Sequence, residues 1–314
     1  MRAMQYQGYG DPSRLKLFEI PPPTWGPSQL LVQVFASSVN PVDWKMHNGG
    51  MRFVVPLRFP SIPGFDYAGK VVQVGTDVHR FRTGDLVYGM TERPPGNASA
   101  EYLVAGENAA ALAPGNLTPL EAAALPMAGL TALQGLRDLG RIRAGQRVLV
   151  INAAGGVGHC AVQIAKAYGA NVTGVTGSRH LDMVEKLGAD EIVDYAQGPG
   201  FLKSCSYDVI FDAIVRWPVR DLLAALSPGG VCVSVLPSPG RVAAAGLLPL
   251  FSKKRSKMLI AKPLGKDLDE LRRLCEAGEL RPVIDKVFRL PELPEAHRYS
   301  QSGRTGGKIV IAVG

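Results

Sequence analysis

Hydrophobic and polar positions change their period along the chain, and these changes divide it into stretches of different structure. Residues 1 to about 120 hold short alternating or β-branched runs that end in Gly or Pro, which predicts strands of a barrel or sandwich. The clearest runs are Leu30–Ala36, Gly69–Gly75 and Asp85–Tyr88, with one helical patch at Pro41–His47. The first stretch is therefore predicted to be a β-rich domain.

Helical signals follow between residues 118 and 140. Thr118 suits an N-cap, Pro119 the first helical position and Glu121 the first turn, so a helix is predicted to begin there. A second helix is predicted over Gly129–Leu139, where Gly140 ends it.

From Gln146 to about Leu236, buried strands alternate with helices. The predicted strands are Arg147–Asn152, Asn171–Thr176, Glu191–Val193, Val209–Asp212 and Val231–Val235. Strands this apolar need cover on both faces, which predicts a doubly wound parallel sheet. The predicted helices between them run from Gly155 to about Tyr168 and over Leu181–Leu187; the tail adds a helix at Leu268–Ala277 and a strand at Lys308–Val313.

Composition fits two folded domains and excludes several classes of function. The 314 residues are 46% hydrophobic and 20% charged, and 35 basic against 27 acidic residues give a net charge of +8. No basic run with interleaved aromatics occurs, so nucleic acid is not a predicted partner. The four cysteines are widely spaced, without a CxxC, which predicts neither disulfides nor a zinc cluster but a reducing cytoplasm. The start of the chain lacks a signal-peptide pattern, and no apolar run reaches the 18 to 20 residues of a membrane-spanning helix.

One apolar stretch, Val242–Phe251, is followed at once by four basic residues at 253, 254, 255 and 257. Such a segment suits an anionic bilayer surface, or a loop and solvated helix start beside a pocket. Its ten residues favour the second interpretation, and the role of the basic cluster stays open.

The strongest chemical signal lies where the strand Arg147–Asn152 meets the following helix. There the dinucleotide fingerprint appears as Ala153-x-Gly155-x-x-Gly158. Gly155 is expected to let the backbone approach a pyrophosphate, and Gly158 to let the helix pack closely on the strand. The free N–H groups of the helix start favour phosphate. The predicted cofactor-binding residues here are Ala154, Gly155, Gly156, Val157 and Gly158.

The end of the next strand selects between the two nicotinamide dinucleotides. NAD sites place Asp or Glu there to bind the ribose hydroxyls, whereas this chain continues as Thr176-Gly177-Ser178-Arg179. Without a carboxylate to repel a 2′-phosphate, and with a hydroxyl and a guanidinium to bind it, NADPH is the predicted cofactor.

A series of motifs in order along the chain resembles one family, the zinc-independent quinone oxidoreductases (zeta-crystallin-like) of the medium-chain dehydrogenase/reductases. The motifs are Ser38–Lys45, Ile62–Gly69, Gly84–Val87, Gly129–Ala132, Lys186–Asp190 and Gly307–Lys308. The resemblance implies a GroES-like catalytic domain over residues 1–122 and 265–314 around a Rossmann NADPH-binding domain over 123–264. It also implies a homodimer formed through the edge of the Rossmann sheet.

The resemblance further implies a site without metal. Zinc-dependent members carry Cys, His and Glu where this chain has Asn40, Phe65 and Asp66. By the same resemblance, the 2′-phosphate is held by Ser178, Arg179 and Tyr195; the nicotinamide is lined by Asn40, Thr131, Val235 and Leu236; and the phosphates are helped by Lys308. From the residues alone, Asn40 before Pro41 also suits an Asx-turn.

A site without a Lewis acid favours direct hydride transfer to an electron-poor acceptor. The first hypothesis is NADPH-dependent reduction of a quinone. The alternatives are an NADPH-dependent enoyl or 2-alkenal double-bond reductase, and a sensor that binds NADPH without turnover. The candidate acceptor pocket is Asn40, Asp43, Trp44 and Lys45, which share one loop, and no proton donor is assigned.

Overall fold

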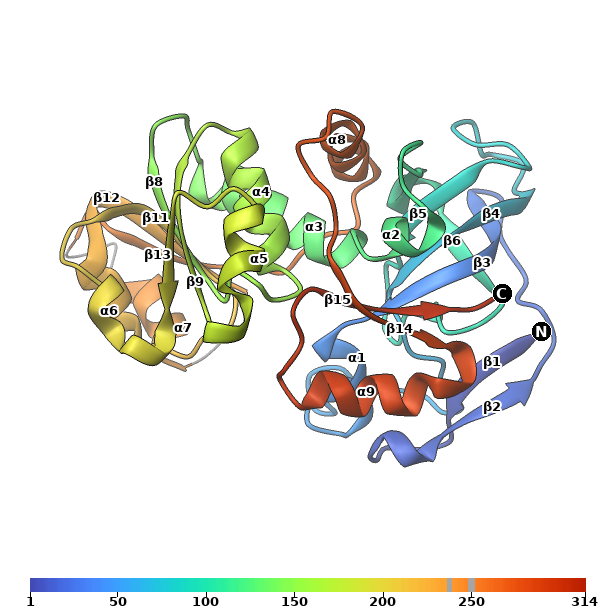
Figure 1. Ribbon diagram of the computed structural model, residues 1–314. Helices are drawn as coiled ribbons and strands as arrows, with labels where there is room; N and C mark the ends of the chain where they lie inside the picture. Colours follow the sequence, from blue (N-terminus) through green and yellow to red (C-terminus); the bar gives the residue numbers. More distant parts are fainter. Residues whose placement is uncertain (236–238, 248–251) are drawn as a thin grey trace. The chain divides into compact units, whose positions relative to one another are not determined.

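The computed structural model describes residues 1–235, 239–247 and 252–314, and it divides the chain into two compact units. The first unit combines residues 1–127, 262–276 and 282–314. The second unit combines residues 128–261 and 277–281. Figure 1 shows the strands and helices of both.

The first unit is built on an antiparallel-rich sheet. Its strands are β1 (Arg2–Tyr6), β2 (Leu15–Glu19), β3 (Gln29–Val39), β4 (Asp66–Val74), β5 (Leu86–Met90), β6 (Tyr102–Gly106), β7 (Ala110–Leu112), β14 (Ile284–Arg289) and β15 (Lys308–Ala312). The larger sheet has the order β14-β15-β3-β4-β5-β7, β6 pairs with β3, and β1 pairs separately with β2. The returning tail therefore supplies β15, which lies directly beside the N-terminal strand β3.

Helices of the first unit cover this sheet. They are α1 (Pro41–His47), α2 (Pro119–Ala123), α8 (Gly265–Glu276) and α9 (Leu293–Gln301), with short 3-10 turns at Pro12–Arg14, Glu107–Ala109 and Leu290–Glu292. The predicted start of α2 is confirmed, because the Glu121 N–H donates to Thr118 Oγ1 and the Thr118 N–H donates to Glu121. α9 runs beside α1 (Figure 1). Neither α9 nor β14 was predicted from the sequence.

The second unit contains a parallel sheet with the order β10-β9-β8-β11-β12-β13. The strands are β8 (Arg147–Ile151), β9 (Asn171–Thr176), β10 (Glu191–Asp194), β11 (Tyr207–Asp212), β12 (Leu226–Ser234) and β13 (Arg255–Met258). The helices are α3 (Pro126–Leu133), which starts at the end of the first unit, α4 (Gly158–Ala167), α5 (Leu181–Lys186), α6 (Val219–Ala225) and α7 (Pro239–Leu247). Short 3-10 turns lie at Ser178–His180, Tyr195–Gln197 and Pro199–Phe201.

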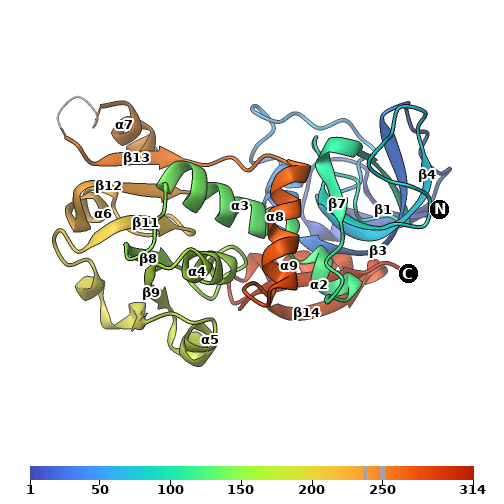
Figure 2. The ribbon, with the colours of Figure 1, turned by 90° about the horizontal axis from the view of Figure 1, so that it is seen from above.

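Helices cover this parallel sheet as the apolar strands require. α4 and α5 pack on β8, β9 and β10, while α6 and α7 pack on β12 and β13 (Figure 2). The predicted fold class, a β-rich domain plus a doubly wound parallel sheet, is confirmed.

One predicted helix differs in form. Gly129–Leu139 lies inside a longer helical segment that begins at Pro126 and continues after Leu133 as a π-helix, Gln134–Gly140. A Cβ on Gly135 would lie 2.5 Å from the Phe211 ring, so this segment packs closely on β11. Periodicity in the sequence does not distinguish a π-helix from an α-helix of the same length.

Candidate functional site

The predicted phosphate loop connects β8 to α4 in the second unit. A Cβ on Gly158 would lie 1.9 Å from the Asn152 backbone oxygen, so no other residue fits there without moving the loop. This close approach of helix start to strand end is the one expected from the fingerprint. Within the described residues, no side chain caps α4, and the His159 N–H already donates to the Gly155 carbonyl at 3.1 Å, so it is the positive end of the helix dipole that favours an anion here.

A second cluster forms where β9 and β10 end at the same edge of the sheet. Ser178 and Arg179 follow β9, and Tyr195 follows β10. The Tyr195 ring lies on Gly177, where an added Cβ would be 2.8 Å from the phenol oxygen. Tyr195 is 39% exposed, and Arg179 is exposed without an ion pair among the described residues. The structure therefore brings together the three residues predicted for the 2′-phosphate.

One part of the reasoning for this cluster was wrong. The end of β9 carries no carboxylate of its own, but the conclusion that none lies near a 2′-phosphate fails, because the Ser178 hydroxyl donates to the carboxylate of Asp194 at the end of β10. This hydrogen bond lowers the pKa of Asp194, so its carboxylate is charged at neutral pH. The carboxylate was missed because it comes from the neighbouring strand, which only the sheet order brings beside Ser178.

In the first unit, Asn40 lies at the start of α1 and is almost fully buried. Its backbone N–H donates to Asp43 Oδ2 at 2.7 Å. Its side chain faces elsewhere: Nδ2 donates to Asp66 Oδ2 at 2.8 Å, and Oδ1 accepts from Lys308 Nζ at 2.6 Å. Both ends of the carboxamide are thus held by charged groups, which fixes its orientation.

The partners of Asn40 form a buried ion pair. Lys308 Nζ lies 3.2 Å from Asp66 Oδ2, and the two side chains are 3% and 0% exposed. The Ser38 hydroxyl and the Met127 backbone N–H also donate to Asp66, at 2.6 and 2.8 Å. Lys308 was predicted to help bind phosphates, but its ammonium is already bound to Asn40 and Asp66. We therefore propose that Lys308 positions Asn40 instead.

Asp43 lies next to this ion pair and is 1% exposed. Its Oδ2 accepts the Asn40 N–H, whereas its Oδ1 has no partner among the described residues. Burial raises the pKa of Asp43 to about 8, with the nearby charge of Asp66 adding to the rise and Lys308 opposing it. The raised pKa favours the protonated carboxyl of Asp43 at neutral pH, although the hydrogen bond from the Asn40 N–H opposes the rise.

The far end of α1 joins a network that sequence reasoning missed. His47 Nδ1 lies 2.7 Å from the Asp43 carbonyl oxygen and its Nε2 lies 2.9 Å from Ser61 Oγ. The imidazole stacks on the Tyr6 ring at 4.3 Å, and the Tyr6 hydroxyl reaches His297. Burial lowers the pKa of both histidines, that of His297 to about 3, so both are neutral at physiological pH.

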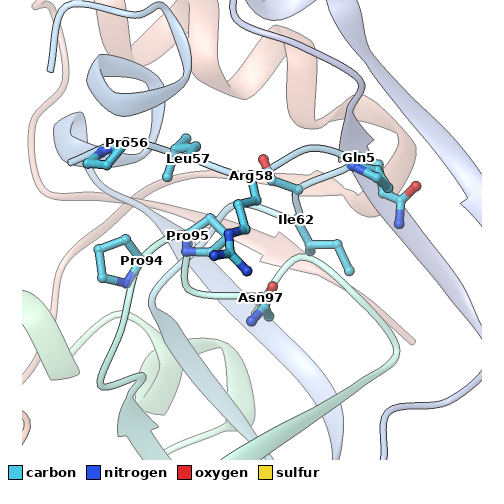
Figure 3. Close-up of a pocket in the computed structure, with 10 residues that line it drawn as sticks. Gln5, Pro56, Leu57, Arg58, Ile62, Pro94, Pro95 and Asn97 are labelled. Carbon is cyan, nitrogen blue, oxygen red and sulfur yellow. The ribbon is translucent and has the colours of Figure 1, made fainter. Parts of the chain in front are cut away.

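A pocket of about 410 Å³ opens beside Ser61 (Figure 3). Arg58 points across it toward Asn97 and is the one charged residue in its lining. Much of the wall is rigid and apolar: Pro56, Leu57, Pro60, Ile62, Pro94 and Pro95. The pocket suits a small molecule with a polar or negatively charged end.

The remaining predicted residues lie in both units. Trp44 Nε1 donates to Ser300 Oγ at 3.1 Å, and Lys45 lies over the Trp44 ring. Thr131 is buried in α3 of the second unit. Val235 follows β12 and donates its N–H to the Asp212 carbonyl. Leu236 lies outside the described residues.

The basic cluster after residue 252 caps helices of the second unit. Lys254 Nζ donates to the Leu223 carbonyl at 2.7 Å, at the end of α6, and Lys257 Nζ donates to the Leu139 carbonyl at 3.0 Å, at the end of the π-helix. Cations at helix C-termini are favourable. Two of the four basic side chains are thereby explained without an anionic partner.

Comparisons with known proteins identify the family. Residues 26–130 match the family described as alcohol dehydrogenase GroES-like domain, and residues 187–311 the one described as zinc-binding dehydrogenase. Quinone-oxidoreductase QR1 of Triphysaria versicolor, named as chloroplastic, is 38% identical over 99% of this chain and 98% of its own length. The chain belongs to the quinone oxidoreductases of the medium-chain dehydrogenase/reductase family. The resemblance proposed from its motifs is confirmed, and the protein is an oxidoreductase.

Two further proteins similar to this chain differ in the substrates that their names give. The quinone oxidoreductase from Coxiella burnetii has a solved structure with a TM-score of 0.89 and 31% identity, covering 100% of this chain and 99% of that one. The 2-methylene-furan-3-one reductase of Solanum lycopersicum is 33% identical over 99% of this chain and 79% of its own length. Reductases of quinones and of an enone are thus both similar to this oxidoreductase.

Among the described residues, neither a metal site nor a membrane-spanning helix occurs. Although one matched family is described as zinc-binding, the residues that the structure describes contain no group of three His, Cys, Asp or Glu side chains suited to a metal ion. The positions expected for zinc ligands hold Asn40, Phe65 and Asp66, and Asn40 and Asp66 are hydrogen-bonded to each other. No helix in the described ranges is long and apolar enough to cross a membrane.

Proposed function

We propose that this oxidoreductase transfers hydride from NADPH to a quinone. The observation that carries the proposal is the edge of the parallel sheet in the second unit. There the start of α4, without a side-chain cap, directs the positive end of its dipole toward the phosphate loop, and the exposed Arg179 follows Ser178 in the turn on whose Gly177 the Tyr195 ring lies. The nicotinamide, when bound, supplies the hydride. The protein's residues bind the cofactor, orient the acceptor against it and exclude water.

Loop residues after β8 and β9 would hold the phosphates of the cofactor. The backbone of Ala154, Gly155, Gly156, Val157 and Gly158 would take the pyrophosphate, and Ser178, Arg179 and Tyr195 the 2′-phosphate. The Ser178 hydroxyl must turn from Asp194 to donate to phosphate, so Arg179 carries more of the preference for NADPH than the serine does. Within the second unit, Thr131 and Val235 are proposed to line the nicotinamide.

In the first unit, Asn40 is proposed to present a hydrogen-bond donor to the acceptor's oxygen. Its Oδ1 and one Nδ2 hydrogen are taken by Lys308 and Asp66, which leaves the second Nδ2 hydrogen as its remaining polar group. A donor aimed at an oxygen that gains negative charge lowers the barrier to hydride transfer. Because the raised pKa of Asp43 favours its neutral form, this carboxyl adds no negative charge beside Asn40, and solvent supplies the proton to the product.

Direct transfer without a metal follows from the residues at the expected zinc positions. A carboxamide paired with Asp66 and Lys308 lacks the thiolate and imidazole ligands that zinc requires. Elemental analysis of the purified protein, with activity after chelator treatment, tests this. We expect no stoichiometric zinc and unchanged activity; one zinc per chain, with activity lost on its removal, would overturn the metal-free mechanism.

A second candidate is an NADPH-dependent enoyl or 2-alkenal double-bond reductase, favoured by the similarity to the 2-methylene-furan-3-one reductase. The same donor at Asn40 serves it, because hydride addition to a conjugated enone also places negative charge on oxygen. A third, a sensor that binds NADPH without turnover, needs the cofactor site alone.

A panel of acceptors separates these functions. Purified protein is mixed with NADPH and, in separate reactions, with 1,4-benzoquinone, 1,4-naphthoquinone, 2-cyclohexenone and a 2-alkenal, and the loss of nicotinamide absorbance is followed. We expect the quinones to be reduced with the highest kcat/KM. Preference for the enones would favour the second candidate, and tight NADPH binding without oxidation by any acceptor would favour the sensor.

Two further parts of the proposal concern assembly and location. We propose a homodimer formed through an outermost strand of the parallel sheet, away from the carboxyl ends of the strands, and light scattering tests it by mass. We also propose a reducing compartment of the cytoplasmic type from the wide spacing of the cysteines, although relatives of this chain are named as chloroplastic.

A further inference from the structure

Arg216 joins the edge of the parallel sheet, although sequence reasoning did not single it out. Its guanidinium carbon lies 4.8 Å from the centre of the Tyr195 ring. Tyr195 follows β10 and Arg216 follows β11, so the contact joins two segments that meet only because both strands end at this edge. Arg216 is exposed and has no ion pair among the described residues.

The loop that carries Arg216 is held in a defined conformation. Asp212, fully buried at the end of β11, accepts the backbone N–H groups of Ile214 at 3.3 Å and Val215 at 2.9 Å. Val215 has a φ of 57°, a left-handed conformation that a β-branched residue adopts only when its surroundings impose it. The buried guanidinium of Arg241 pairs with Asp212 from α7. The backbone that carries Arg216 is thus held from the core of the unit.

The charges of the side chains around Tyr195 indicate what the contact between Arg216 and Tyr195 does. Asp194 is ionised and hydrogen-bonded to Ser178, so it opposes a 2′-phosphate beside that serine. Arg179 alone would offset one negative charge. A second cation, Arg216, makes the sum of these three side chains positive, which favours a dianionic phosphate over the neutral ribose hydroxyl of NADH.

We infer that Arg216 is a specificity-determining residue for the phosphate on the ribose of NADPH, acting both as a second cation and by holding the Tyr195 ring over Gly177. This inference rests on the proposed use of NADPH. Tyr195 is the link, because its phenol group lies next to the Gly177–Ser178 turn while its face binds the guanidinium.

Calorimetric titration tests the inference without turnover. Dissociation constants for NADPH, NADH and 2′,5′-ADP are measured on the full chain and on Arg216→Gln, Arg216→Lys and Arg179→Ala. Arg220→Gln is the matched control, since the Arg220 side chain lies four residues further on, is 86% exposed and, among the described residues, pairs only with the adjacent Asp221. We expect Arg216→Gln to weaken NADPH and 2′,5′-ADP by about fivefold, or about 1 kcal/mol, and to leave NADH within about twofold.

The other variants separate a failure of the inference about Arg216 from a failure of the proposed NADPH site. Arg216→Lys should keep part of the affinity, because an ammonium retains the charge, and Arg220→Gln should bind as the wild type does. Equal weakening of NADPH and NADH by Arg216→Gln would overturn the inference, as would an unchanged NADPH affinity while Arg179→Ala loses it. If neither Arg179→Ala nor Arg216→Gln affects NADPH binding, the proposed NADPH site itself fails.

Discussion

Replacing Lys308 by methionine tests the buried cluster that holds Asn40. The substitution keeps the aliphatic stem but removes an ammonium that lies 3.2 Å from Asp66, in a pair whose side chains are 3% and 0% exposed. Asp66 then stays buried with hydrogen bonds from neutral donors only, and Asn40 loses the partner of its Oδ1. Leaving a buried charge without its partner costs about 3–5 kcal/mol, so we expect Lys308→Met to lower the free energy of unfolding by that amount.

Urea denaturation followed by circular dichroism measures this loss, with Arg2→Gln as the control. Arg2 pairs with Glu101 at the surface, where the two side chains are 51% and 27% exposed, so its loss should cost less than about 1 kcal/mol. In the double variant Asp66→Asn with Lys308→Met, the two losses should not add, because both remove the same pair. A loss for Lys308→Met no larger than the loss for Arg2→Gln would refute the reasoning.

Three further changes test other parts of the structure. Asp43 has a pKa near 8, raised above its unfolded value near 4, so it stabilises the fold at low pH and this contribution falls by up to about 1.4 kcal/mol per pH unit between the two values; stability curves of Asp43→Asn should lack that fall, and an identical slope would contradict it. Gly158→Ala places a Cβ 1.9 Å from the Asn152 oxygen, so calorimetry should show NADPH binding reduced at least about tenfold with the β-rich unit still folded. Lys254→Met removes a cap of α6, so it should lower the free energy of unfolding by about 1 kcal/mol or less. The fraction of protein that sediments with anionic vesicles should be the same for this variant and the wild type; a smaller fraction for the variant would support the membrane interpretation of this segment.

Features that depend on neighbours in sequence were predictable. The start of α2 follows from Thr118, Pro119 and Glu121, which lie within one turn. The need for glycine at 158 follows from the strand–turn–helix context, and the structure gives its reason in the Asn152 oxygen. Each depends on atoms that the chain connects within a few residues.

Pairings across the sheets were not predictable from one sequence. Lys308 reaches Asn40 over 268 residues because β15 pairs with β3. Asp194 meets Ser178, and Arg216 meets Tyr195, only because their strands end at one edge of the sheet. Strand order and register, which no short motif carries, decide all three contacts.

Steady-state oxidation of NADPH and of NADH with 1,4-naphthoquinone, on wild type and Arg179→Ala, tests the central claim most directly. Because Arg179 is exposed at the edge of the sheet, its loss should not unfold the protein. The account predicts quinone-dependent oxidation with a higher kcat/KM for NADPH than for NADH. In Arg179→Ala the ratio of these two values should fall about tenfold, because the KM for NADPH rises while kcat stays the same. No oxidation with the quinone, or equal use of both cofactors by the wild type, would contradict it.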